Sequence, residues 1–450
     1  MTDERFFDND EPLMRAVLDW AHRRIVDGQD PQSGARPAAD LEAELSASIG
    51  PAGIGGREAL RRFAEVIVPA TRAQGHHMNL AYVPSAPTPA SLTFDVAVSA
   101  AEIFAGTWEV GAGAIHAENQ ALDWLADLAG FPSTAGGTFV QGGTVGNLSA
   151  LAVARARARS RGAVPDTRWA IAATAGAHSS IRSAARVLDC EIVSVPVDDA
   201  GRFTGDALAA ALDEAQGVTV FAVVATGGTT NAGIVDELAA IADVCEQRDL
   251  WLHVDGAYGL AALLAPSVRH RFDGIERADS FVVDPHKWLF APYDCCALVY
   301  RDPGDATVVH AQHAEYLDLV DRSDWNPSDY AIQLTRRARG LPLWFSLATY
   351  GTDRYVEAVE QGLTTARAIT EGIRSAEHLE LVLEPDLSIV LFRRIGWSAD
   401  RMVEWSGEHA EAGTVLIIPT AWRGESVFRI CVVSPDTVAE HVLAVLDTMR

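Results

Sequence analysis

The sequence predicts an α/β protein: a large domain with a mostly parallel sheet, followed by a smaller α+β domain. From about residue 90, short apolar runs alternate with helical patterns, and the runs lack polar alternation. Such strands belong to a sheet that is buried on both faces, as in parallel α/β domains. Beyond residue 350, a long helical pattern precedes apolar runs at 388–392 and 427–432 and a closing helix.

The first 75 residues are predicted to form a helical arm or docking segment without a core of its own. Apolar residues at helical spacing predict helices at 11–27 and 58–70, with segments rich in Pro and Gly between them. We therefore expect three parts in these 450 residues: the arm at 1–75, the large domain at 76–350 and the small domain at 351–450.

Within the large domain, helices and strands are expected to alternate. Helical patterns cover 92–104, 117–129, 148–159, 181–188, 204–214 and 235–248. Strand-like runs lie at 169–173, 191–195, 218–225, 251–254, 280–283 and 297–300. This order is typical of a chain that returns to the same sheet through crossover helices.

Composition excludes several classes of protein. The net charge of −25 disfavours binding to nucleic acid or to an anionic membrane surface. No apolar stretch approaches the roughly 20 residues that span a bilayer, and the acidic start does not resemble a signal peptide. The five cysteines show no metal-ligand spacing, so we expect no metal and a reducing, cytoplasmic location. An anionic ligand would need a dedicated local site.

One such site is predicted at residues 142–147, Gly-Gly-Thr-Val-Gly-Asn, between a short strand and a helix. Glycines at a helix start expose backbone N–H groups, and the helix dipole adds to their attraction for an anion. The segment matches neither a Walker P-loop nor a dinucleotide fingerprint. A glycine-rich helix cap without any ligand is the alternative.

Three further residues could carry chemistry. Lys287 follows an apolar strand, so its amine is expected in a low-dielectric environment that lowers its pKa and makes it a Schiff-base nucleophile, although a surface turn is also compatible. Asp255 ends another strand, where a carboxylate could keep a heteroaromatic ring protonated or simply cap buried backbone. His178 heads a helix, where it could cap the helix or stack on a planar cofactor.

Together with three other segments, these residues resemble the group II PLP-dependent amino acid decarboxylases. That family includes the aromatic-L-amino-acid, histidine and glutamate enzymes. The segments are Asp-Pro-His-Lys-Trp at 284–288 with Tyr-Asp-Cys at 293–295, Gly-Thr-Thr at 228–230, and Arg-Arg-Ala-Arg-Gly-Leu at 336–341. The likeness runs from about residue 75 to about residue 435, in the family's order.

The resemblance implies pyridoxal 5'-phosphate (PLP) as cofactor. It also implies a fold type I, aspartate aminotransferase-like architecture with a seven-stranded sheet. The implied cofactor-binding residues are Lys287, Asp255, Ala257, His178, Gly143, Thr144, Thr230 and His286. Lys287 would carry PLP as a Schiff base, Asp255 would pair with the pyridine nitrogen, and His178 would stack on the ring. Tyr316 matches the loop tyrosine that protonates the substrate carbon after carbon dioxide leaves. A homodimer with active sites at the subunit interface is also implied.

The chain departs from the family's usual pattern at Val145, Gly146 and Asp284. Many relatives have an acidic and then a small residue after Gly-Gly-Thr, and asparagine is common where Asp284 stands. The phosphate cradle is expected to survive, because its donors are backbone N–H groups and Thr144. Asp284 should alter the charge around Lys287.

The residues at 77–84 resemble the family's substrate segment, in which Tyr82 and Pro84 match the aromatic and histidine branch. Arg429 matches an arginine of the small domain near the active site. Met78, Leu80 and Val83 would offer an apolar wall, unless the segment only packs the arm against a partner subunit. We therefore expect decarboxylation of an aromatic or large apolar L-amino acid to the amine and carbon dioxide.

Four alternatives stay open. They are an aldehyde synthase, a decarboxylase of an acidic or aliphatic amino acid, an aminotransferase or carbon–sulfur lyase, and a non-catalytic protein of the same fold. The presence of Tyr316 and His178 favours simple decarboxylation.

Overall fold

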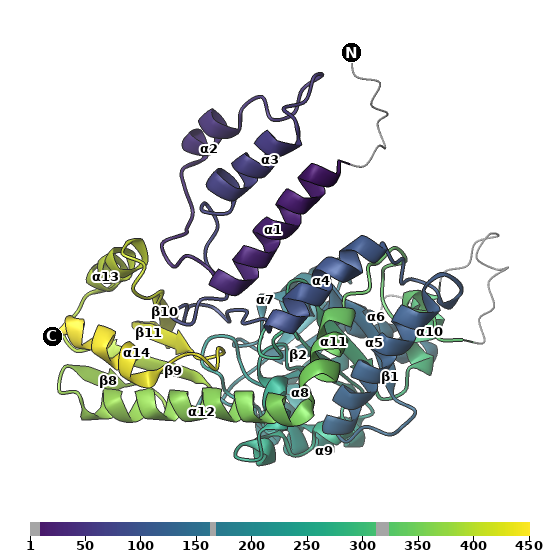
Figure 1. Cartoon of the computed structure of the whole chain (residues 1–450). Helices are drawn as coiled ribbons and strands as arrows, with labels where there is room; N and C mark the ends of the chain where they lie inside the picture. The colour runs from purple at the N-terminus through teal and green to yellow at the C-terminus, as the bar shows by residue number, and fades with distance from the viewer. Residues whose placement is uncertain (1–9, 163–167, 312–323) are drawn as a thin grey trace.

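The computed structural model describes residues 10–162, 168–311 and 324–450 (Figure 1). Its large sheet has the strand order β1-β7-β6-β5-β4-β2-β3. These strands are β1 (Gly136–Val140), β2 (Trp169–Thr174), β3 (Glu191–Val195), β4 (Thr219–Thr226), β5 (Trp251–Asp255), β6 (Ser280–Val283) and β7 (Cys296–Tyr300). Only β7 runs antiparallel to its neighbours, β1 and β6. The predicted seven-stranded, mostly parallel sheet is therefore confirmed.

Both faces of this sheet are buried, as its unbroken apolar strands predict. In β4, Val223 and Ala225 enter one hydrophobic cluster, while Ala222 and Val224 enter another on the opposite face. The first cluster is completed by α5 (Trp108–Leu128), α8 (Gly205–Glu214) and α9 (Leu238–Arg248), and the second by α6 (Gly143–Ser160), α7 (Ser179–Val187) and α10 (Gly304–His310). Helices on both faces of the sheet thus fix the positions of the strand ends that form the candidate site.

Two helices begin a full turn or more before the residue at which the periodicity predicts their start. The helix expected at residue 117 already begins at Trp108, and the helix expected at residue 148 begins at Gly143. The second difference matters for function, because it places Gly143 and Thr144 in the first turn of α6. Glycine and β-branched residues hid this turn from an analysis based on apolar spacing.

A second, antiparallel sheet has the order β10-β11-β9-β8. Its strands are β8 (Leu379–Leu381), β9 (Ile389–Arg394), β10 (Ile418–Trp422) and β11 (Glu425–Cys431). Three helices pack with it: α12 (Thr352–Ser375), α13 (Ala399–Glu411) and α14 (Ala439–Leu446). This matches the small α+β unit predicted after residue 350, although the short β8 and β10 were not predicted. The exact boundaries at 75 and 350 stay predictions.

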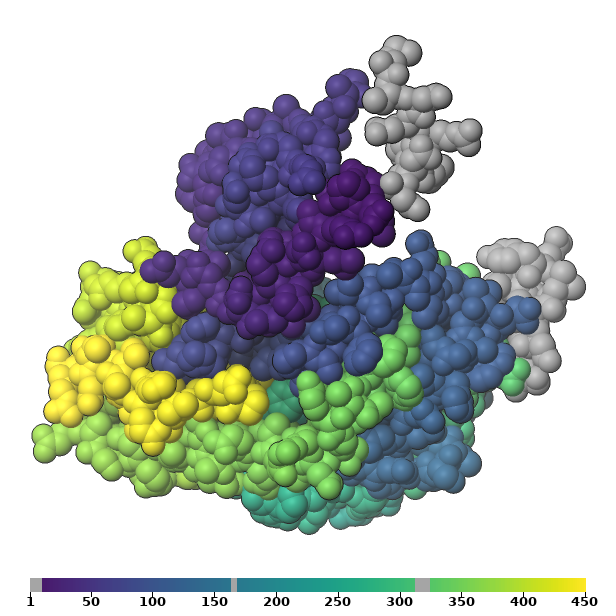
Figure 2. Space-filling model, in the orientation of Figure 1, coloured from purple at the N-terminus to yellow at the C-terminus, as the bar shows by residue number. Residues whose placement is uncertain are grey.

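Residues 10–70 form a helical arm that projects from the rest of the described chain (Figures 1 and 2). It contains α1 (Glu11–Asp27), α2 (Ala38–Leu45), α3 (Gly56–Arg62) and a π-helical turn (Phe63–Ile67). None of α1, α2 and α3 has a buried residue. The arm therefore has little core of its own.

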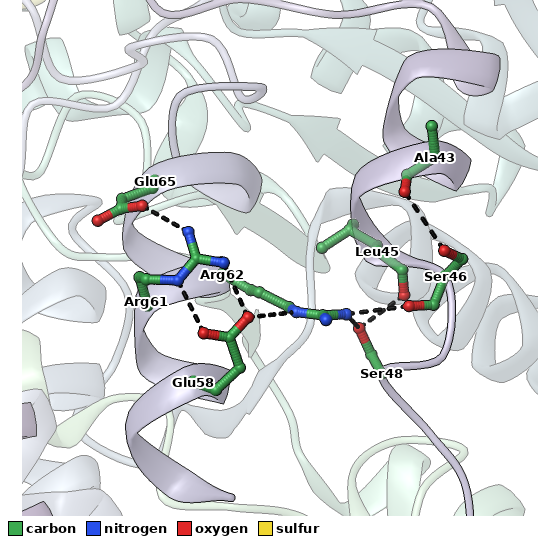
Figure 3. A network of polar contacts seen from close by, with 8 residues as sticks. All are labelled: Ala43, Leu45, Ser46, Ser48, Glu58, Arg61, Arg62 and Glu65. Carbon is green, nitrogen blue, oxygen red and sulfur yellow. Dashed lines mark hydrogen bonds and ion pairs between the residues drawn. The ribbon is translucent and has the colours of Figure 1, made fainter. Parts of the chain in front are cut away.

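Polar contacts hold the arm together (Figure 3). The Arg62 guanidinium donates to the Ser46 carbonyl at 3.0 Å and to the Ser48 hydroxyl at 2.7 Å. Glu58 accepts hydrogen bonds from both Arg61 and Arg62. Such exposed pairs each contribute little to the free energy of unfolding. We infer that the arm needs further contacts to be held firmly.

The arm leads into α4 (Pro89–Ala101), which packs against α11 (Leu341–Tyr350). Among the residues that the structure describes, no helix combines the length and the apolar character needed to cross a membrane.

Candidate active site

A cavity of about 240 Å³ lies where parallel strands of the large sheet end. Segments that follow β1, β2 and β6, together with the last residues of β4 and β5, form its wall. The carboxyl ends of parallel strands are where ligands of open α/β sheets collect. All eight residues predicted to bind the cofactor line this one cavity: Gly143, Thr144, His178, Thr230, Asp255, Ala257, His286 and Lys287.

The amino end of α6 supplies an anion cradle at one side of the cavity. Gly142 is the N-cap, and the first-turn N–H groups of Gly143 and Thr144 have no partner within the helix. A Cβ atom at Gly143 would lie 3.2 Å from the Cβ of Ala257 and 3.5 Å from an oxygen of Asp284. A side chain there would fill the cradle, so glycine keeps it open to a phosphate group.

Gly146 explains one departure from the family pattern. A Cβ atom at this position would lie only 2.6 Å from Cγ1 of Val282 in β6. Glycine therefore lets α6 lie close against the sheet, and the cradle itself is untouched. The structure gives no functional reason for Val145.

Asp255 is the carboxylate of the site. It ends β5, is 5% exposed, and both of its oxygens accept hydrogen bonds. Oδ2 accepts from the Asn147 amide at 2.9 Å, and Oδ1 accepts from the Ala257 N–H at 3.2 Å. These two hydrogen bonds fix the orientation of the carboxylate in the cavity wall.

Lys287 and Asp284 form an ion pair in the cavity wall, with Nζ 2.8 Å from Oδ2. Burial by itself lowers the pKa of Lys287, but the carboxylates of Asp284 and Asp255 outweigh burial and raise this pKa above its ordinary value. The expectation of a lowered lysine pKa is therefore wrong for the chain without cofactor, and Asp284 is the main cause. The Lys287 ammonium in turn lowers the pKa of the fully buried Asp284 against its desolvation.

His178 does both things that the sequence allows. It is the N-cap of α7, where its Nδ1 accepts from the Ser180 N–H at 3.2 Å, and its ring lines the cavity. His286 lines the cavity too, with its ring tilted against that of Tyr293 at 4.9 Å.

Three predicted substrate residues do not line the cavity in the described chain: Tyr82, Pro84 and Arg429. Arg429 is 6% exposed, and its guanidinium donates to the carbonyls of Thr230, at 2.7 and 3.1 Å, and of Tyr82. It thereby joins the cavity wall to the backbone at Tyr82, which has a φ of 55°, while the Tyr82 side chain is 62% exposed. Tyr316 lies outside the described residues.

The interpretation of Met78, Leu80 and Val83 as a wall of the substrate pocket is wrong. Met78 and Leu80 are buried in the core of the small unit, and Val83 is buried in the main core. The reason is backbone pairing: the Leu80 N–H donates to Leu416, and the Leu80 carbonyl accepts from Cys431. These bonds turn the apolar side chains inward.

Two signals in the sequence were missed. Asn147 lies four residues after Gly143, on the same side of α6, and His253 lies two residues before Asp255 on the same face of β5; helical and strand periods could have found both. Moreover, 35 of the 36 basic Lys and Arg residues are arginine, so Lys287 is the only lysine of the chain. A Schiff-base lysine can have no other position.

The described residues fit PLP. An open cradle at a helix start suits the phosphate, a buried carboxylate suits a protonated pyridine nitrogen, and the only lysine suits the aldehyde. When bound, the cofactor supplies an electron sink that is conjugated with the α-carbon of an amino acid.

Comparisons with known proteins agree with this chemistry. The pyridoxal-dependent decarboxylase conserved domain matches residues 59–395. An aromatic-L-amino-acid decarboxylase of Bacillus atrophaeus is 32% identical over 390 residues, which cover 83% of this chain and 81% of that protein. An L-2,4-diaminobutyrate decarboxylase of Rhizobium meliloti (strain 1021) is also 32% identical, covering 83% of this chain and 77% of that protein.

Among solved structures, Oryza sativa TDC with PLP and tryptamine superposes with a TM-score of 0.89 at 25% identity, covering 99% of this chain and 98% of that one. Sequence, fold and cavity thus lead to one conclusion: the chain belongs to the pyridoxal-dependent decarboxylase family and is a PLP-dependent amino acid decarboxylase.

Proposed function

We propose that this enzyme decarboxylates an aromatic or large apolar L-amino acid, releasing the amine and carbon dioxide, and that it works as a homodimer. The residues that line the cavity support the proposal about the substrate. Within the described residues, no arginine lines the cavity, and Lys287 is the only lysine that does. Three carboxylates line it, so an acidic side chain would meet repulsion without a bidentate partner.

An exposed aromatic ring near the cavity supports the choice of an aromatic substrate. Arg429 links the Tyr82 backbone to Thr230 of the cavity wall, and the Tyr82 ring is free to meet a ligand. Aromatic side chains offer large contact areas to other rings. The curated relative from Bacillus atrophaeus, named for aromatic L-amino acids, points the same way.

In this mechanism each residue has a physical task. The amine of Lys287 is the group that would hold the cofactor covalently. Asp255 would keep a proton on the pyridine nitrogen of the bound cofactor, and His178 would cover the ring and exclude water from that side. The amino end of α6 would bind the phosphate and so help to orient the bound substrate.

Tyr316 is proposed to deliver the proton to the α-carbon after carbon dioxide has left. A positioned acid of this type contributes about 10²- to 10⁴-fold to the rate. Tyr316→Phe is therefore expected to lower amine formation by at least about 100-fold and to divert product toward the aldehyde, with ammonia and peroxide as markers. Cofactor absorbance should stay as in the wild type. Unchanged amine yield would remove Tyr316 from the mechanism.

A cationic side chain is a second candidate for the substrate. Asp294 lines the cavity with a side chain that is 41% exposed, although Arg339 pairs with it at 2.5 Å. A diaminobutyrate-type substrate could compete for this carboxylate, and the relative from Rhizobium meliloti (strain 1021), at 32% identity, is named for that amino acid.

The arm supports the homodimer. Four large apolar residues of α1 are well exposed: Met14, Val17, Leu18 and Val26. An apolar surface of this kind on a thin projecting segment is costly in water and marks a contact surface. A second copy of the chain would cover it.

A panel assay separates these possibilities. Purified holoenzyme is incubated with tryptophan, tyrosine, phenylalanine, histidine, valine, glutamate and 2,4-diaminobutyrate, and carbon dioxide, amine, ammonia and peroxide are measured. We expect the highest kcat/KM with an aromatic amino acid, and amine without ammonia or peroxide. A preference for diaminobutyrate supports the second candidate, a preference for glutamate contradicts both, and aldehyde with ammonia and peroxide identifies an aldehyde synthase.

A further inference from the structure

In the cavity wall, a series of hydrogen-bonded side chains joins Asp255 to His178. Asn147 is at its centre and is 1% exposed. Its Nδ2 lies 2.9 Å from Oδ2 of Asp255 and 2.9 Å from Oγ of Ser180. Ser180 Oγ in turn lies 2.8 Å from Nδ1 of His178. The carboxylate and the ring thus share one hydrogen-bonded bridge.

The hydrogen-bonded series continues on the other side of Asn147. Its Oδ1 lies 2.9 Å from Nε2 of His253, whose Nδ1 lies 2.8 Å from Oγ of Ser280. The indole N–H of Trp251 donates to the same Ser280 hydroxyl at 2.9 Å. His253 is completely buried, and burial lowers its pKa to about 4, so it is neutral at physiological pH.

At each end of this hydrogen-bonded series, an N–H group that can only donate limits the direction of the neighbouring hydrogen bond. The Trp251 indole has a hydrogen and no acceptor, so the Ser280 hydroxyl is free to turn its own hydrogen toward His253. At the other end, the backbone N–H of Ser180 donates to Nδ1 of His178, which must therefore be an acceptor. Every hydrogen between these ends then points in one direction, from Trp251 toward His178.

We propose that Asn147 is a positioning residue that orients the Asp255 carboxylate and, through Ser180, holds His178 as the tautomer with its hydrogen on Nε2. In this arrangement the amide NH₂ donates to Asp255 and to Ser180, and its oxygen accepts from His253. The Nε2–H group of His178 is then left as a hydrogen-bond donor on the ring that lines the cavity. This role rests on the proposed function, in which Asp255 would meet the nitrogen of the cofactor ring and His178 would meet its face.

The opposite amide orientation makes a contrary prediction. Its oxygen would face the Asp255 carboxylate, so Asp255 would have to be protonated. Ser180 would donate to the amide oxygen and accept from a hydrogen on Nδ1 of His178, which conflicts with the backbone N–H of Ser180 at 3.2 Å. The tautomer of His178 therefore shows in which direction the hydrogen bonds of the whole series run.

The experiment is ¹⁵N NMR of holoenzyme labelled in its histidines, with the His178 signals assigned by their absence from His178→Gln. We expect a pyridine-type Nδ1 and a pyrrole-type Nε2 in the wild type. A pyrrole-type Nδ1 overturns the proposal. Because this measurement needs no substrate, a failure of the proposed decarboxylation in the panel assay would be distinguishable from a failure here.

Two variants and a control test the bridge. Ser180→Ala removes only the link to His178; we expect mixed tautomers, a kcat lowered about three- to tenfold, and a Kd for PLP within about threefold of the wild type. Asn147→Leu also removes a hydrogen bond to a charged group, so the Kd for PLP should rise by about tenfold or more.

Ser346→Ala is the matched control, because Ser346 is as deeply buried and bonds Thr88 at 2.7 Å and Tyr355 at 2.6 Å away from the cavity lining. It should change neither the tautomer nor the Kd. Retention of the wild-type tautomer and Kd in Asn147→Leu overturns the proposal. If that variant does not fold, the wild-type spectrum and the Ser180→Ala variant still test the proposed role of Asn147.

Discussion

The cavity wall and the N-terminal arm contrast strongly in how they satisfy their side chains. Around the cavity, Asn147, His253 and Asp255 are at most 5% exposed, and each has hydrogen-bond partners within the chain. In the arm, Leu18 is 52% and Val26 is 67% exposed, and α1 has no buried residue. The single chain therefore satisfies the buried polar groups of its cavity wall but leaves the apolar side chains of its arm exposed. Chemistry and assembly should be separable by mutation.

The largest effect is expected at the cavity, from Lys287→Ala. Without the only lysine, the visible absorbance of bound cofactor should vanish and kcat should fall by at least about 1,000-fold, because the nucleophile is lost. Spectrophotometry and steady-state kinetics measure both. Lys287→Arg is the matched variant, since it keeps a cation beside Asp284 but no nucleophilic amine. Both variants should keep the wild-type oligomer; an active variant would remove Lys287 from its role.

This contrast also shows what the sequence can predict. Unbroken apolar strands predicted the buried sheet, and the motifs around Gly143, Asp255 and Lys287 predicted residues that line one cavity. Local order along the chain is enough for such residues, because strand ends of a parallel sheet meet at one edge.

The rest depends on long-range contacts. Met78 and Leu80 turn inward because distant segments near 416 and 431 bond their backbone. Arg429 is occupied by carbonyls of Thr230 and Tyr82, and the pKa of Lys287 depends on the distance to Asp284. Periodicity contains no information about these pairings, so the interpretation of the substrate segment was wrong. The residues predicted to bind the cofactor do line one cavity.

An intermediate effect is expected in the arm, from the double variant Met14→Glu with Leu18→Glu. These residues lie four apart on α1 and are 53% and 52% exposed, so they share a face of the helix. Charges there should weaken dimerisation by about 10- to 100-fold, because burying an unpaired carboxylate is costly. Sedimentation velocity measures the change, and the absorbance of bound cofactor reports the cavity.

Val308→Glu is the control for this experiment, since Val308 is 86% exposed on α10, away from the arm. It should leave the oligomer unchanged. A wild-type monomer, or a double variant that dimerises as tightly as the wild type, would contradict the proposed role of the arm.

The smallest effect is expected from Asp284→Asn, which should change the pKa of Lys287 while the cavity keeps its other residues. The Asp284 carboxylate raises the pKa of Lys287, and only the neutral amine attacks an aldehyde. Removing the carboxylate should therefore lower this pKa and shift the pH profile of PLP uptake by the apoenzyme to lower pH, by about one unit. Stopped-flow absorbance measures the profile. A shift to higher pH would show that Asp284 does not control the charge of Lys287.

The central claim is that the Lys287 amine holds the cofactor within the cavity, and covalent trapping tests it most directly. Holoenzyme is reduced with borohydride, digested and mapped by mass spectrometry. Because the chain has one lysine, only the peptide containing Lys287 and the N-terminal amine can carry the reduced cofactor. We predict the mass increment on the Lys287 peptide. An increment on the N-terminus alone, or none at all in active enzyme, would contradict the account.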